Sequence, residues 1–359
     1  MKLPQLKIGD LVARVPIVQG GMGVGISLSG LASAVAEEGG IGVIAAAMIG
    51  LTSSKPNKSA PEAQSEALAD EIRKAKAKTS GIVGVNIMVA LTDFAAQVST
   101  SVKEGVDVIF SGAGLPLDLP KYLVDGAKTK LVPIVSSGRA ASIICKKWIS
   151  KFDYIPDAFV VEGPKAGGHL GFHRDQLDDP KFSLESILPE VLGAVKVFEE
   201  KTGKTIPVIA AGGIYTGEDI CKYIKMGAAG VQLGTRFVAT HECDANEKFK
   251  QAYVDSTKED MTVIQSPVGL PGRAIKNDFL DAVSAGKKTP FKCSFKCLKT
   301  CQVETTPYCI ASALISAQRG KLKYGFAFAG ANAYRTQKIV SVKELIAELK
   351  AEFEVACPA

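Results

Sequence analysis

His169 stands in the segment EGPKAGGHLG (162–171), where the glycines before and after it leave the backbone free to bend. The chain has three histidines, and this one follows a short apolar run typical of a strand. An imidazole titrates near neutral pH, so this residue is suited to remove a proton next to an electron-withdrawing group. Glu162 lies seven residues earlier, at the same strand end. We therefore take His169 as the candidate catalytic residue; the alternative is a surface histidine in a flexible turn.

Four cysteines form a second concentration of reactive side chains. The stretch CSFKCLKTCQVETTPYC contains Cys293, Cys297, Cys301 and Cys309. In a helix, the first three would share one face, because they are spaced by four residues. Four neighbouring thiols could bind zinc or an iron–sulfur cluster, but no C-x-x-C pair is present. We favour cysteines that pack against a helix, and we predict no metal site.

Arg273 lies in SPVGLPGRAIKNDF (266–279), a segment expected to govern access to the site. Its guanidinium could pair with an anionic substrate or with a cofactor pyrophosphate. It could equally be a solvent-facing arginine that caps the turn after GLPG. Both interpretations stay open. The other two histidines, His173 and His241, are expected at the surface.

Eight apolar, β-branched runs recur along the first two thirds of the chain, each ending in glycine or a small polar residue. They are continuously apolar, which is typical of strands buried on both faces. Segments 27–40, 61–78 and 216–228 lie between runs and carry helix-capping and charge patterns. Eight strand–helix units predict an α/β fold, a (β/α)8 TIM barrel, although a doubly wound sheet gives a similar alternation. The runs are 15–21, 40–47, 82–89, 106–114, 131–138, 158–163, 206–213 and 229–237.

The pattern changes after the eighth run and divides the chain into three parts. Residues 1–239 are expected to form the barrel, and 240–300 a small helical lid inserted after strand eight. Residues 301–359 contain two helical segments, near 308–318 and 342–354, which are expected to complete the barrel wall.

The predicted strand ends are rich in glycine and small polar residues, and TIM-barrel sites form at the carboxyl ends of the strands. Gly212-Gly213 and Gly234-Thr235 end strands seven and eight, the usual position of a phosphate in such barrels. Small residues around the rim let backbone amides approach a wide, flat ligand. An aromatic ring with a phosphate tail, such as FMN, fits this pattern. No Walker A sequence occurs, and no G-x-G-x-x-G leads from a strand into a helix.

Composition excludes several other classes. The net charge is +6, and the Lys and Arg residues are scattered along the chain. They form no basic stripe interleaved with aromatic residues, so we expect no nucleic-acid partner. The longest apolar stretch, 41–51, is too short to cross a membrane. The first residues lack the apolar core of a secretion signal, so we expect a cytoplasmic protein with reduced thiols.

Six segments in combination resemble the nitronate monooxygenase family, once called 2-nitropropane dioxygenases. That family is homologous to the FMN-dependent enoyl-acyl carrier protein reductases. The resemblance covers about residues 10–280 and separates the two activities poorly. Its segments are PIVQGGMGVGISLSGLASAVAEEGGIGVI, GVNIMV, VEGPKAGGHLG, IPVIAAGGI, GVQLGTRF and GRAIKN.

The resemblance implies an FMN-binding TIM barrel with a small lid, and it assigns roles to particular residues. His169 matches the histidine taken as catalytic in the family. The flavin ring would lie over Gly20, Gly21 and Met22. Asn86 and Glu162 would lie near the ring. The phosphate or its neighbourhood would be held by Gly168, Gly212, Gly213, Gly234 and Thr235.

The implied activity is the oxidation of alkyl nitronates with O2 to a carbonyl compound and nitrite. His169 would either deprotonate a neutral nitroalkane or position the anionic nitronate. One alternative is an enoyl thioester reductase that passes hydride from NAD(P)H through FMN. A second is a non-catalytic barrel that binds a phosphorylated ligand. The physiological substrate and the oligomeric state stay open, with a homodimer among the options.

Overall fold

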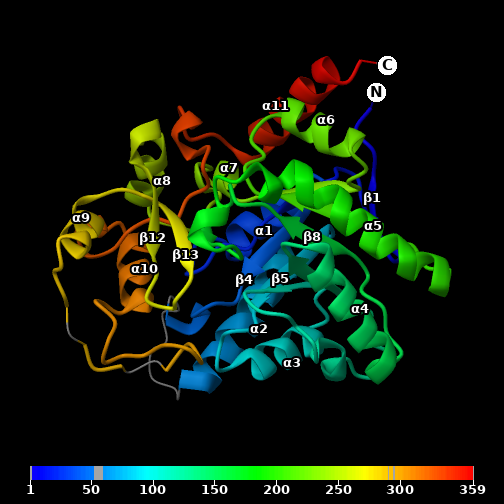
Figure 1. The fold of residues 1–359 in the computed structure, drawn as a ribbon, viewed down its shortest axis with the longest axis horizontal. Helices are drawn as coiled ribbons and strands as arrows, with labels where there is room; N and C mark the ends of the chain where they lie inside the picture. Colours follow the sequence, from blue (N-terminus) through cyan, green and yellow to red (C-terminus); the bar gives the residue numbers. More distant parts are fainter. Residues whose placement is uncertain (1, 52–59, 290, 294–295, 359) are drawn as a thin grey trace.

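The computed structural model describes residues 2–51, 60–289, 291–293 and 296–358. In this part of the chain, eight parallel strands close a barrel in the order β10-β11-β3-β4-β5-β6-β7-β8 (Figure 1). Each lies within a few residues of a predicted run, and closure confirms the TIM barrel over the doubly wound sheet. The strands are β3 (Ile17–Gln19), β4 (Ile41–Ala45), β5 (Ile82–Met88), β6 (Val108–Gly112), β7 (Lys130–Val135), β8 (Phe159–Glu162), β10 (Val208–Ala211) and β11 (Gly230–Leu233).

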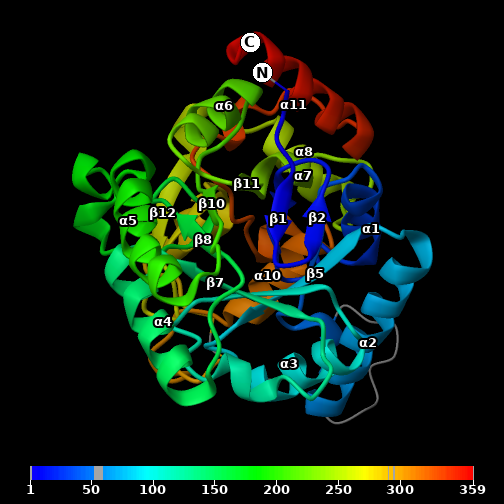
Figure 2. The ribbon, with the colours of Figure 1, turned by 90° about the vertical axis from the view of Figure 1, so that its right-hand side faces the viewer.

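The barrel interior is a packed apolar core. Successive strand residues alternate between the lumen and the outer layer, so both faces must be apolar. Val43, Phe110 and Val160 fill the lumen together with Leu6 and Ile8 of the N-terminal hairpin. That hairpin, β1 (Leu6–Ile8) and β2 (Leu11–Ala13), lies across the barrel end opposite the lid (Figure 2). One end of the barrel is thereby closed, which leaves the other end for ligands.

Helices surround the barrel, and the three that the sequence predicted between strands are present as α1, α2 and α6 (Figure 2). The start of α6 shows the local cause: Thr216 and Asp219 form a reciprocal capping box. None of the helices among the described residues combines the length and apolar character needed to cross a bilayer. The outer helices are α1 (Ser29–Glu37), α2 (Ala60–Lys78), α3 (Phe94–Lys103), α4 (Gly138–Phe152), α5 (Leu184–Thr202), α6 (Gly217–Lys225) and α11 (Val342–Ala356).

The two C-terminal helices have different places in the fold. Helix α11 joins the wall, where it packs against α6 and α1. A disulfide between Cys221 on α6 and Cys357 after α11 ties them together, so the expectation of reduced thiols is wrong for this pair. Helix α10 (Ile310–Gln318) instead packs on Val24 and Met48, at the open end of the barrel. It roofs the site rather than completing the wall.

The segment after the barrel is mixed rather than purely helical. It holds α8 (Glu247–Val254), α9 (Asp278–Ser284) and the antiparallel strands β12 (Met261–Gln265) and β13 (Pro271–Ile275). Two residues from the loop after β8, β9 (Gly168–His169), form the third strand of this sheet. In Figure 1 these elements gather at one side of the barrel, beside α10. Residues 290 and 294–295 of the predicted lid lie outside the described residues.

Candidate active site

A cavity of about 300 Å³ lies between the carboxyl ends of the strands and the roof formed by α10 and the lid. It brings together residues predicted from seven separate stretches of the sequence. The predicted site residues that line it are Gly20, Gly21, Met22, Asn86, Glu162, Gly168, His169, Gly212, Gly213, Gly234, Thr235 and Cys297.

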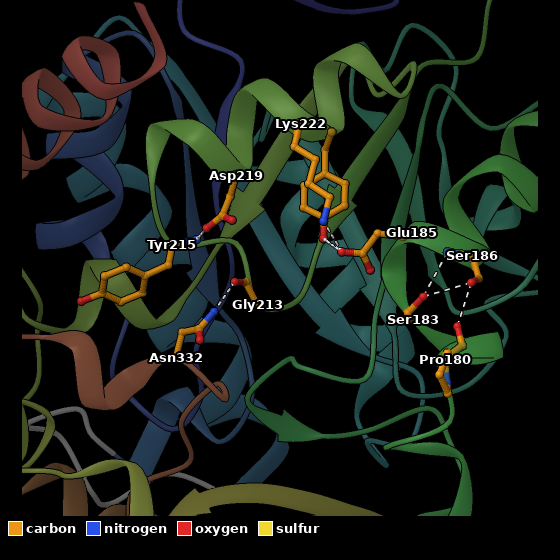
Figure 3. Close-up of polar contacts among 10 residues, drawn as sticks. Pro180, Ser183, Glu185, Ser186, Gly213, Tyr215, Asp219, Lys222 and Asn332 are labelled. Carbon is orange, nitrogen blue, oxygen red and sulfur yellow. Dashed lines mark hydrogen bonds and ion pairs between the residues drawn. The ribbon is translucent and has the colours of Figure 1, made fainter. Parts of the chain in front are cut away.

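One end of the cavity, at β10 and β11, is polar and built from backbone. Gly212 and Gly213 have φ angles of +97° and +88°, which side-chain-bearing residues rarely adopt. The Asn332 amide donates to the Gly213 carbonyl at 2.6 Å and holds this loop in place (Figure 3). After β11, at the start of the short helix α7 (Thr235–Val238), the Thr235 hydroxyl accepts from the Gly330 amide at 3.0 Å. The Gly213 and Thr235 amides find no acceptor among the described residues, so both are available to an anionic ligand.

Glycine is present at the rim for two different physical reasons. A side chain at Gly212 would place Cβ 2.7 Å from the Gly163 carbonyl oxygen, and one at Gly21 would overlap Asn86. Glycine is needed there by the packing of the protein itself. A Cβ at Gly168 would meet nothing within 4 Å, and one at Gly234 would meet only Met22, at 3.4 Å. At these two positions the space beside the backbone is open to the cavity.

His169 is fixed by the lid on more than one side. Its backbone pairs with Gly272 of β13, and its Nε2 lies 2.7 Å from the hydroxyl of Ser266. The ring of Phe328 meets the imidazole edge-on, with 5.0 Å between centroids. His169 is therefore not a surface histidine in a flexible turn, because it is a half-buried residue of the cavity wall. His173 and His241 are exposed, as the sequence predicts.

Burial sets the protonation of the two ionisable groups in the wall. The enclosing protein lowers the pKa of His169 to about 4, because the imidazolium would lose its hydration there. The same cause raises the pKa of Glu162 to about 7. Both side chains are half-buried and border the cavity. At neutral pH His169 is therefore neutral, while Glu162 is close to its midpoint.

The other end of the cavity, near β4 and β5, is apolar. Ala311 and Leu314 of α10 face it from the roof, and Met48 and Leu91 extend from the ends of the loops below. Leu298 pairs with Leu91 in an isolated β-bridge, which anchors the cysteine-containing loop to the barrel. This end suits a hydrocarbon group.

The described residues of the cysteine segment are not helical, so the one-face arrangement that a helix would give is absent there. Residues 291–293 and 296–309 contain no helical turn that would align Cys293, Cys297 and Cys301 on one face. Within the described residues, no three His, Cys, Asp or Glu side chains are arranged to hold a metal ion. Cys297 borders the cavity, and both it and Cys309 pack against the cluster of Val24 and Met48.

Arg273 lies on β13 but outside the cavity wall. Its guanidinium donates to the Pro164 carbonyl at 3.0 Å and so holds the loop that leads to His169. Its Nε is buried without a partner among the described residues. A direct contact with substrate or cofactor stays a prediction.

Several residues of the site were not predicted from the sequence. Ser266 and Phe328 hold His169, Asn332 and Gly330 support the polar end, and Lys165 packs its stem against Gly213. One signal was available: FAFAGANAYR (326–335) is an apolar run that ends in small residues, like the strand ends of the barrel.

Comparisons with known proteins agree with this architecture. The family model for nitronate monooxygenase matches residues 5–352. A CoA dehydrogenase of Mycobacterium tuberculosis, acting on a hydroxy-methyl-oxo-octahydroindene carboxyl-CoA, is 29% identical over 273 residues, 76% of this chain and 66% of that protein. The chain thus spans just under two thirds of that relative. A probable nitronate monooxygenase of Staphylococcus aureus is 27% identical over 305 residues, 75% of this chain and 77% of that protein.

Solved structures share this fold over nearly the whole chain. FabK from Thermotoga maritima superimposes with a TM-score of 0.71 and 27% identity, covering 95% of this chain and 93% of its own. A nitroalkane oxidase from Streptomyces ansochromogenes gives a TM-score of 0.72 at 24% identity, covering 96% and 97%, which supports the fold alone. With the family model matched over nearly its whole length, this chain belongs to the nitronate monooxygenase family of oxidoreductase enzymes.

Proposed function

We propose that this protein binds FMN across the barrel mouth and oxidises alkyl nitronates with O2 to carbonyl compounds and nitrite. The single observation that carries the proposal is the layout of the cavity: amide donors at one end, His169 in the wall and an apolar pocket opposite. Family membership makes the enzyme an oxidoreductase, so the non-catalytic alternative is set aside. A cytoplasmic location and a homodimer stay predictions.

The residues present fit FMN. The free amides of Gly213 and Thr235 suit a phosphate, and the open space beside Gly168 and Gly234 leaves room for a ligand close to the backbone. Gly20, Gly21 and Met22 would lie against the ring, with Asn86 and Glu162 beside it. Bound there, FMN would accept an electron from the nitronate and deliver electrons to O2.

An enoyl thioester reductase is the second candidate. The apolar end beneath α10 could hold an acyl chain, and the likeness to FabK at 27% identity supports this candidate. In that case NAD(P)H would be the reductant. The same residues would bind the flavin, so the geometry of the polar end does not separate the two candidates.

Anaerobic flavin reduction separates them. The protein is reconstituted with FMN and mixed, without oxygen, with an alkyl nitronate or with NAD(P)H in separate experiments. We expect the nitronate to bleach the flavin absorbance and NAD(P)H to leave it unchanged, and air should then yield nitrite and the carbonyl compound. Bleaching by NAD(P)H alone would support the reductase. Failure to take up FMN would contradict both.

A further inference from the structure

Ser266 contacts the imidazole of His169 through a side-chain hydrogen bond. It lies in the turn between β12 and β13, where its amide donates to the Leu270 carbonyl and its carbonyl accepts from the Gly269 amide. The side chain is 3% exposed, and its Oγ lies 2.7 Å from His169 Nε2. The turn therefore holds the hydroxyl against one nitrogen of the imidazole.

The direction of this hydrogen bond follows from counting hydrogens. The Ser266 Oγ already accepts a long hydrogen bond from the Val268 amide, at 3.4 Å. The hydroxyl has one hydrogen of its own, and among the described residues Nε2 of His169 is the acceptor within reach. If Nε2 carried a hydrogen, the buried hydroxyl hydrogen would have no acceptor, which costs free energy. Every group is satisfied when Ser266 donates and Nε2 accepts.

We propose that Ser266 fixes His169 as the Nδ1–H tautomer, so that the ring donates a hydrogen bond to an anionic substrate oxygen instead of accepting a proton. The ring borders the cavity, and Nδ1 takes no partner among the described residues. This nitrogen is not fully buried, so a ligand in the cavity that His169 borders can reach it. Burial, which keeps the pKa of His169 near 4, holds the ring neutral at neutral pH.

This assignment, which rests on the proposed function, selects the protonation state of the substrate. A neutral nitroalkane must lose a proton from carbon, and an Nδ1 that already carries its hydrogen is not a base. An alkyl nitronate has lost that proton and presents an anionic oxygen that accepts a hydrogen bond. The enzyme should therefore act on nitronates and leave neutral nitroalkanes almost untouched.

The tautomer can be read without substrate. The chain has three histidines, so ¹⁵N-histidine labelling gives a tractable NMR spectrum, and His169→Asn assigns the resonance. We expect a protonated Nδ1 and an unprotonated Nε2 in the wild-type protein. A protonated Nε2 would overturn the proposal. This measurement does not depend on activity. If the enzyme does not turn over nitronates, the proposed function is wrong, but the tautomer can still be measured.

Two substitutions at His169 separate a donor from a base. The amide nitrogen of Asn can occupy the Nδ1 position, whereas that of Gln reaches the Nε2 position, and neither amide is a base. We expect His169→Asn to keep kcat/KM for a nitronate within about tenfold of wild type, and His169→Gln to lose about tenfold more. Equal losses, with FMN binding intact in both variants, would contradict the donor role.

Ser266 is tested as a positioning residue. Ser266→Ala should mix the two tautomers in the NMR spectrum and raise KM for the nitronate about tenfold, with FMN uptake unchanged. Ser266→Thr restores the hydroxyl and should rescue both readouts. Ser101→Ala is the matched control, because Ser101 is a fully buried serine that donates to the Gln97 carbonyl on α3. A wild-type tautomer in Ser266→Ala would overturn the assignment.

Discussion

The two ends of the cavity are built in different ways. At the polar end, Gly213 and Thr235 follow the neighbouring strands β10 and β11 and offer backbone amides. At the apolar end, Met48, Leu91 and Ala311 come from separate elements and offer side chains. Strand β5 stands opposite β10 in the barrel order, so the two ends face each other across the mouth. A backbone-built site depends on local conformation, whereas a side-chain-built site depends on long-range packing.

The largest effect is expected from breaking the polar end. Gly212→Ala places Cβ 2.7 Å from the Gly163 carbonyl oxygen at a φ of +97°, so the loop must move. We expect FMN binding to weaken on the order of 100-fold, measured by flavin fluorescence in a reconstitution titration.

The control for this change is Gly126→Ala. Gly126 also has a positive φ, +78°, but its Cβ would meet nothing within 4 Å, and it lies in the loop before β7. It should lose some stability and keep its FMN affinity. Equal FMN affinities in the two variants would mean that the Gly212 loop does not bind the cofactor.

A smaller effect is expected from filling the apolar end. Ala311→Leu adds volume beneath the roof, at a residue that lines the cavity. The KM for a long-chain nitronate should rise roughly tenfold, while that for ethyl nitronate changes little, as steady-state kinetics would show. Ser312→Leu, on the exposed face of the same helix, is the control. If both nitronates respond alike, the substrate chain does not occupy this end.

The smallest effect concerns Glu162, on the strand β8 beside the polar end. Because burial raises its pKa from 4.5 to about 7, the folded state favours the neutral carboxyl, and that stability is lost as pH rises through this window. In the cofactor-free protein, Glu162→Gln removes the titration. The Tm of the variant relative to wild type should therefore increase as pH rises from 4.5 to above 7. A constant difference would show that Glu162 is not enclosed as described.

Sequence reasoning located the barrel and most of the polar end, and the cause is local. Strands buried on both faces must be continuously apolar, and their ends must turn, so glycine and small residues mark them. The same reasoning failed for β12 and β13, because a five-residue strand in a polar stretch leaves little periodic signal. It misplaced α10 because Ile310, Ala313 and Ile315 make this helix apolar without indicating which partner it covers.

The sequence by itself determined the barrel, the order of its strands and the rim on which a phosphate can rest. Only the tertiary structure decided which residues complete the site. Ser266 contacts His169 across 97 residues of sequence, and Gly330 contacts Thr235 across 95 residues. The physical reason is the distance along the sequence over which each interaction acts. Turns and strand periodicity are set by neighbouring residues, whereas a hydrogen bond between distant segments exists only once the whole core has placed them together.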